Sequence, residues 1–135
     1  MKGQLTNEFV LLLFIFILAA IGLTVFAFQK TTEQNDLKQY IKLRDLCSEI
    51  STIINLATIS NGYRSNFTLP PNIEGANYSV NVHNTSLSIT VQNKTCISSL
   101  RALQIRNDTS STPFMLVPGS QYQITNEDWV IIIDS

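Results

Sequence analysis

The sequence is poor in the residue types that carry catalysis. Among its 135 residues it has one histidine, His83, and two cysteines, and only 14% of its residues are charged. It contains no H-E-x-x-H motif, no C-x-x-C pair, no P-loop and no glycine-rich nucleotide fingerprint. We therefore expect that the protein is not an enzyme, and that it holds neither a metal nor a cofactor.

Clustered positive charge is also lacking. The formal net charge is −1, with nine Lys and Arg residues against ten Asp and Glu. Charges of both signs are mixed along the polar part of the chain, so no basic stripe offers a footprint for a polyanion. We therefore do not expect a nucleic acid among the partners.

One stretch lacks charge altogether. Residues 9–28 read FVLLLFIFILAAIGLTVFAF, and as a helix they rise about 30 Å, which matches the hydrocarbon thickness of a bilayer. The alternative is a cleaved secretory signal. However, only Lys2 supplies positive charge before the run, the run is longer than the apolar part of a usual signal, and no clear A-x-A site follows it. The sequence therefore predicts a retained membrane-spanning helix.

The helix is expected to continue beyond the membrane. Neither Pro nor Gly occurs between Gln29 and Gly62. Apolar residues recur there at helical spacing, and they are Leu37, Tyr40, Ile41, Leu46, Cys47, Ile50, Ile53, Ile54 and Ala57. Asn61 and Gly62 are the residue types that end a helix in a left-handed cap. The sequence predicts one helix over residues 4–61, with an amphipathic outer half over residues 30–60.

Beyond Gly62 the apolar period changes to two, which indicates strands. Tyr78, Val80 and Val82 alternate with polar residues, as do Leu87, Ile89 and Val91. Residues 83–85 lie between the two runs as a turn, so we expect an antiparallel hairpin. The segment after Lys94 fits a short helix or a strand equally well. The pattern over residues 114–133 predicts two or three closing strands, with a turn at residues 126–128. An aromatic residue that opens an apolar strand is expected in the core, so we place Trp129 there; the alternative is a surface stacking platform. The fold class is thus α+β, with a small antiparallel sheet domain over residues 62–135.

The N-terminus carries the most specific pattern. A basic residue and a glycine, Lys2 and Gly3, precede a polar stub, one acid and the apolar run. This arrangement resembles the class III, or prepilin-type, signal of archaeal type IV pilin-like proteins. The match to the Q-x-S-x-E-x-x-x-L opening of that family consists of Gln4, Thr6 in place of Ser, Glu8 and Leu12. In that family a membrane peptidase cuts after the glycine on the cytoplasmic side. The resemblance implies that residues 1–3 are a signal peptide and that the mature chain begins at Gln4.

The resemblance covers residues 2–28 and carries several expectations. It implies a type IV pilin-like fold and a structural subunit of an extracellular filament for adhesion, assembled from identical or related subunits. A prepilin peptidase, an assembly platform and an ATPase would be further partners. In such filaments the acid of one subunit neutralises the new N-terminus of its neighbour, which here would pair Glu8 with Gln4. Alternatively, Glu8 complements the positive end of its own helix.

Five sequons for N-glycosylation lie in residues 62–135. Their asparagines are Asn66, Asn77, Asn84, Asn93 and Asn107. This modification takes place on exposed loops outside the cytoplasm, so we expect a cytoplasmic N-terminus and an outward-facing C-terminal domain. The alternative is that these segments are simply turns and strands rich in Asn and Thr.

Cys47 and Cys96 have neither a metal-binding nor a redox spacing. We expect a disulfide that ties the helix to the sheet and stabilises the domain by roughly 4 kcal/mol; the alternative is two buried free thiols. The rival to the filament hypothesis as a whole is a membrane-anchored extracellular binding module that does not polymerise. In that protein Glu8 would be dispensable.

Overall fold

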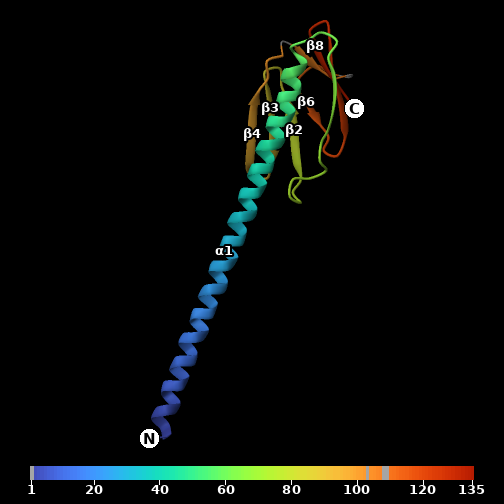
Figure 1. Ribbon diagram of the computed structural model, residues 1–135. Coiled ribbons are helices and arrows are strands. Elements are labelled where there is room, and N and C mark those ends of the chain that lie inside the picture. Colours follow the sequence, from blue (N-terminus) through green and yellow to red (C-terminus); the bar gives the residue numbers. More distant parts are fainter. Residues whose placement is uncertain (1, 103, 108–109) are drawn as a thin grey trace. The chain divides into compact units, whose positions relative to one another are not determined.

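The computed structural model describes residues 2–102, 104–107 and 110–135, and the side chains of residues 2–7 are not part of that description. Within these residues a long helix, α1 (Lys2–Ala57), is followed by eight strands (Figure 1). The predicted fold class is confirmed, because a long apolar helix at the N-terminus precedes a β-rich domain. The chain divides into two compact units, Met1–Leu37 and Lys38–Ser135.

The strands form two four-stranded sheets. Their bounds are β1 (Arg64–Thr68), β2 (Tyr78–Val82), β3 (Ser86–Val91), β4 (Lys94–Ser99), β5 (Gln104–Arg106), β6 (Phe114–Leu116), β7 (Gln121–Glu127) and β8 (Val130–Asp134). One sheet has the order β1-β7-β8-β5 and the other has the order β4-β3-β2-β6. The pair β5 and β8 is parallel and the other described pairs are antiparallel. The single sheet expected from the sequence is therefore two sheets, because the chain changes sheet after β1, before and after β5, and after β6.

The hairpin expected from the two alternating runs is confirmed. Val80 on β2 pairs with Ile89 on β3, and every second side chain of both strands is buried. The segment after Lys94, which fitted a helix or a strand, forms β4 and β5. The strand β1 was not predicted from the sequence, and it pairs with β7, near the C-terminal end of the chain.

The second unit has one hydrophobic core, to which α1 and both sheets contribute. From α1 the core receives a stripe at helical spacing, which consists of Leu43, Leu46, Cys47, Ile50, Ile54 and Ala57. Only part of the expected apolar stripe is buried. Leu37, Tyr40 and Ile41 belong to the same stripe, but each is about half exposed. Only the last four turns of α1 bury an apolar face against the domain.

Trp129 is not in the core, contrary to the expectation from the sequence. Its side chain is 59% exposed. The turn between β7 and β8 consists of Asp128 and Trp129 rather than residues 126–128, since Glu127 pairs directly with Val130. The apolar run that suggested a buried aromatic residue begins one residue later, with the strand itself.

Candidate functional site

Most of the exposed large hydrophobic side chains in the described chain lie on the first half of α1. The most apolar stretch of 18 residues on α1 has a mean hydropathy of 3.0, and none of it is buried. The exposed fractions reach 76% at Phe16 and 78% at Phe28. Water would be an unfavourable solvent for this much apolar surface. The helix is long and apolar enough to cross a membrane, and a signal sequence near the N-terminus has the same properties.

Polar atoms inside this apolar segment are satisfied within the helix. The hydroxyl group of Thr24 donates a hydrogen bond to the carbonyl oxygen of Ile21 over 2.8 Å. A hydroxyl group in hydrocarbon has no water to bond, and this local bond removes the cost of leaving it without a partner. The one hydroxyl group within residues 9–28 is therefore compatible with an apolar environment.

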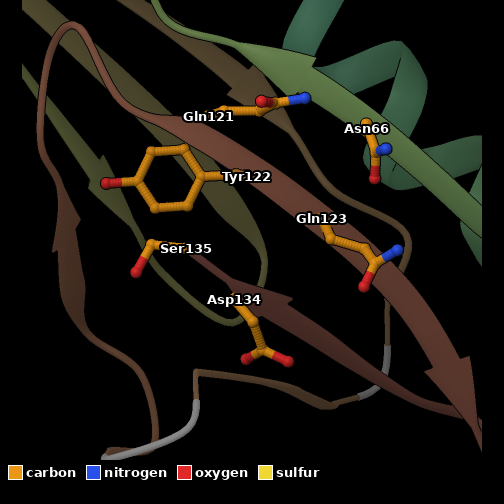
Figure 2. Close-up of a pocket in the computed structure, with 6 residues that line it drawn as sticks. All are labelled: Asn66, Gln121, Tyr122, Gln123, Asp134 and Ser135. Carbon is orange, nitrogen blue, oxygen red and sulfur yellow. The ribbon is translucent and has the colours of Figure 1, made fainter.

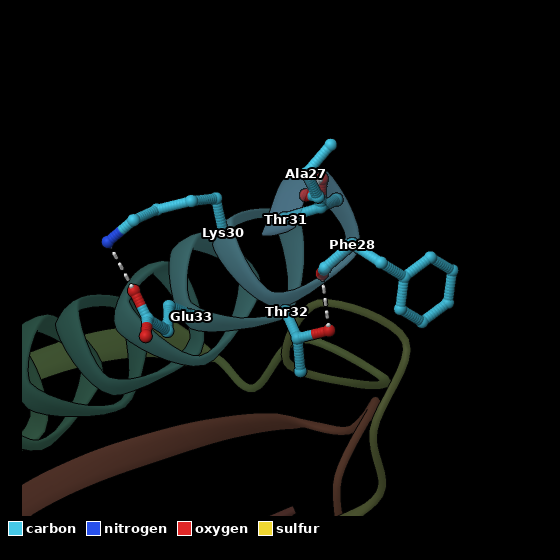
Figure 3. A network of polar contacts seen from close by, with 6 residues as sticks. All are labelled: Ala27, Phe28, Lys30, Thr31, Thr32 and Glu33. Carbon is cyan, nitrogen blue, oxygen red and sulfur yellow. Dashed lines mark hydrogen bonds and ion pairs between the residues drawn. The ribbon is translucent and has the colours of Figure 1, made fainter. Parts of the chain in front are cut away.

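The polar border of the segment lies at residues 30–33, where Figure 3 shows the contacts. Lys30 Nζ lies 3.0 Å from Glu33 Oε2 and 5.9 Å from the ring centroid of Phe26. The hydroxyl groups of Thr31 and Thr32 donate to carbonyl oxygens four residues earlier, over 3.0 and 3.1 Å. Because both charges of the ion pair are more than half exposed, the pair stabilises little. The pair marks the point on α1 at which the uncharged apolar segment ends.

At the opposite end of the apolar segment lies Glu8, which is exposed on α1. The predicted processing residues Lys2, Gly3 and Gln4 are in the first turns of α1, and their side chains lie outside the described residues. A contact between Glu8 and the amine of Gln4 would join two chains. The processing site and the role of Glu8 therefore stay predictions.

Cys47 and Cys96 are brought together, although neither spacing nor motif required it. Cys47 is fully buried on α1 and Cys96 is partly buried on β4, and both are free thiols. Burial, followed by a hydrogen bond and a charge interaction with Cys96, raises the pKa of the Cys47 thiol from its ordinary 9.0 to about 12. The two sulfur atoms are thus close enough to interact, and the disulfide itself stays a prediction.

The predicted glycosylation sites differ in accessibility. Asn66, Asn77, Asn84 and Asn93 are exposed, whereas Asn107 is partly buried. The Oδ1 atom of Asn107 accepts hydrogen bonds from the backbone and the hydroxyl group of Ser110, over 2.7 and 3.0 Å. Four of the five sequons therefore present their asparagine to a modifying enzyme in the folded domain.

A cavity of about 360 Å³ lies beside one of these asparagines. Figure 2 shows Asn66 on β1 and Gln121, Tyr122 and Gln123 on β7, with Asp134 and Ser135 from the last strand and its end. Tyr122 is buried and stacks on Phe67 with ring centroids 5.6 Å apart. Its hydroxyl group already accepts a hydrogen bond from the Val117 backbone. The ring and the hydroxyl group of Tyr122 therefore already make contacts within the domain.

A second cavity, of about 270 Å³, is lined by residues that the sequence did not single out as a site. They are Thr58, Arg101, Ala102, Asn126, Trp129 and Ile131. They come from the segment after α1, the segment before β5, and the hairpin of β7 and β8, so no spacing in the sequence connects them. Among the described residues, no group of three or more His, Cys, Asp and Glu side chains could hold a metal ion.

Comparison with known proteins gives no match to a protein-family model, to a curated protein or to a solved structure.

Proposed function

We propose that this chain is a structural subunit of an extracellular type IV pilus-like filament that attaches cells to surfaces. The observation that supports it best is the exposed apolar segment over residues 9–28, directly preceded by a single acid, Glu8. A prepilin peptidase would cut after Gly3 on the cytoplasmic side. An assembly platform and an ATPase would then move the helix from the membrane into the filament, with the C-terminal domain outside.

The physical argument concerns what surrounds the apolar helix once it leaves lipid. A helix without charge over twenty residues needs apolar neighbours, and identical helices packed side by side supply them. The carboxylate of Glu8 is costly wherever that packing excludes water. An ammonium group on Gln4 of a neighbouring subunit would offset this cost. Such a pair stabilises modestly, but it penalises neighbours in the wrong register and so selects one assembly.

The test is N-terminal sequencing and intact mass of the protein sheared from cells that produce it. We expect a chain that begins at Gln4 and sediments as a filament. Glu8→Gln should abolish sedimentable filaments while the cleaved subunit stays in the membrane. The matched control is Glu33→Gln, because Glu33 is an exposed acid on the same helix and lies beyond the apolar segment.

The outcomes separate the two candidate functions. A surface protein that still begins at Met1, with Glu8→Gln behaving as the unmodified chain, would contradict the filament and support a membrane-anchored binding module. Loss of filaments in both variants would also count against a specific role for Glu8.

A further inference from the structure

The turn between β7 and β8 holds a tryptophan where the backbone favours glycine. Glu127 pairs with Val130, so Asp128 and Trp129 form a two-residue turn. Both have positive φ angles, of 50° and 68°. Two-residue hairpins of this kind strongly prefer Gly at the second position, and a bulky side chain with positive φ is strained. Strained residues of this kind cluster at functional sites, where the surrounding structure holds them in place.

The surrounding contacts do hold this turn. The backbone N–H of Gly62 donates to the carbonyl oxygen of Asn126 over 2.8 Å. The backbone N–H of Asp128 donates to Oδ1 of Asn61 over 3.1 Å. The segment that follows α1 is thereby tied to the β7 side of the hairpin tip, up to the first residue of the turn. Trp129 follows this held residue directly, and its side chain remains 59% exposed, as a preorganised contact surface requires.

An unused acceptor lies buried beneath the lining of the cavity beside Trp129. Asn126 is 1% exposed, and its Oδ1 atom has no hydrogen-bond partner among the described residues. A buried polar atom without a partner is uncommon and costs free energy. Thr58 and the exposed Arg101 lie on the same lining. The cavity thus combines one exposed aromatic ring with a hydroxyl group and a guanidinium group.

We propose that this cavity, lined by Thr58, Arg101, Ala102, Asn126, Trp129 and Ile131, binds a pyranose unit of an uncharged saccharide. The apolar C–H face of the sugar ring would stack on the indole ring. Its hydroxyl groups would donate to the Thr58 hydroxyl oxygen and accept from the Arg101 guanidinium group, because a sugar hydroxyl group both donates and accepts.

The charge around the site favours an uncharged ligand. Arg101 is the one cation of the lining, and the exposed acids Glu127 and Asp128 lie on the hairpin that carries Trp129. An anionic sugar would be attracted by one charge and repelled by two at short range. A peptide with an apolar side chain would leave the Arg101 guanidinium group without a partner in the complex. The site does not depend on filament assembly, since all its residues belong to the unit Lys38–Ser135.

The chain has a single tryptophan, so its fluorescence reports on this site alone. The full chain is produced without glycosylation in detergent micelles and titrated with methyl glucoside, methyl mannoside, N-acetylglucosamine, maltose and glucuronate. We expect a saturable change in emission with at least one uncharged sugar. No saturable change with any of the uncharged sugars, or a change with glucuronate alone, would overturn the proposal.

Variants separate binding from folding. Trp129→Gly removes the aromatic ring and places the preferred residue at φ 68°, so the melting temperature should be equal or higher while binding weakens roughly tenfold or more. Binding of the variants is measured by ligand-observed NMR, because this variant has no tryptophan. Arg101→Gln should weaken binding several-fold. The control is Ile97→Ala, which removes an exposed apolar residue on β4. A Trp129→Gly variant that binds as the unmodified chain does would contradict the proposal.

Two sources could supply the sugar, namely a glycan of the surroundings and a glycan carried by the chain itself. The glycosylated chain from its native surface distinguishes them. Emission that responds to added sugar as the unglycosylated chain does indicates an external source. Emission that is already shifted, and that returns to the unglycosylated value after enzymatic removal of the glycans, indicates the chain's own glycan.

Discussion

Asn126 on β7 donates a hydrogen bond from Nδ2 to the carbonyl oxygen of Ala57, the last residue of α1, over 2.7 Å. The last carbonyl groups of a helix have no partner within it, and here a strand near the other end of the chain supplies one. The backbone N–H of Asn126 also donates to the carbonyl oxygen of Tyr63 over 3.0 Å. One residue thus joins the helix end and the following segment to β7.

We expect Asn126→Ala to lower the free energy of unfolding by about 1–3 kcal/mol, because the carbonyl oxygen of Ala57 would remain buried without this donor. Chemical denaturation of the detergent-solubilised chain measures the change. Gln123→Ala serves as the control, since Gln123 is exposed on the same strand, and it should change the free energy by less than about 0.5 kcal/mol. Equal effects of the two variants would show that the bond to Ala57 is unimportant.

Mild oxidation should join Cys47 and Cys96 within one chain. The structure places the two thiol groups close enough to interact. Each sulfur loses a hydrogen to the oxidant, and the intact mass falls by two hydrogen atoms. The bond should stabilise the domain by roughly 4 kcal/mol, measured by denaturation with and without a reductant.

The control for this bond is Cys96→Ser, whose stability should not respond to the reductant. Disulfide-linked dimers of the unmodified chain, or a stability that the reductant leaves unchanged, would contradict the intramolecular pair.

The reduced domain should lose stability in alkaline solution. Burial raises the pKa of Cys47 from 9.0 to about 12 and that of Tyr78 from 10.0 to about 12. Below pH 9 both groups keep their protons whether the chain is folded or unfolded. Between about pH 9 and 12 the unfolded chain releases them first, so the free energy of unfolding falls as the pH rises.

Denaturation midpoints of the reduced chain measured from pH 8 to pH 11 give this slope. Cys47→Ala should reduce it from pH 9 upward, because it removes the group with the larger shift. An identical slope in this variant would mean that Cys47 does not couple folding to pH.

If the sequons are used, occupancy should follow accessibility. We expect glycans at the exposed Asn66, Asn77, Asn84 and Asn93 before Asn107, whose side chain is partly buried and bonded to Ser110. Glycopeptide mass spectrometry of the native protein measures occupancy at each site. Higher occupancy at Asn107 than at the four exposed residues would indicate modification before folding.

The helix and the central hairpin could be predicted because each depends on a local pattern. Val80 and Ile89 lie in runs of strict alternation, and the helix contains neither Pro nor Gly from Gln29 to its end. β1 was missed since RSNFT has a single apolar residue, Phe67, and its pairing with β7 is non-local. Trp129 was placed in the core because the apolar run does not show whether its first residue belongs to the strand or to the turn before it.

The candidate sites also differ in whether the sequence alone could reveal them. The apolar segment and Glu8 are continuous in the sequence, so their pattern could be read directly. The cavity beside Trp129 depends on Thr58, Arg101 and Asn126 meeting in space, which requires the fold. The pairing of Cys47 and Cys96 could be predicted in part. Two cysteines suggest a pair, but their contact depends on α1 packing against β4.

The strand order β1-β7-β8-β5 has a consequence for how this chain reaches its final state. β1 is the first strand to be synthesised and its partner β7 is the seventh. The backbone N–H and C=O groups of β1 therefore remain unpaired until nearly the whole chain has been synthesised. Pairing over such a separation is slow, and open strand edges invite aggregation in the meantime. The sheet β1-β7-β8-β5 can therefore form only after β7 and β8 have been synthesised, and β1 is exposed as an unpaired edge until then.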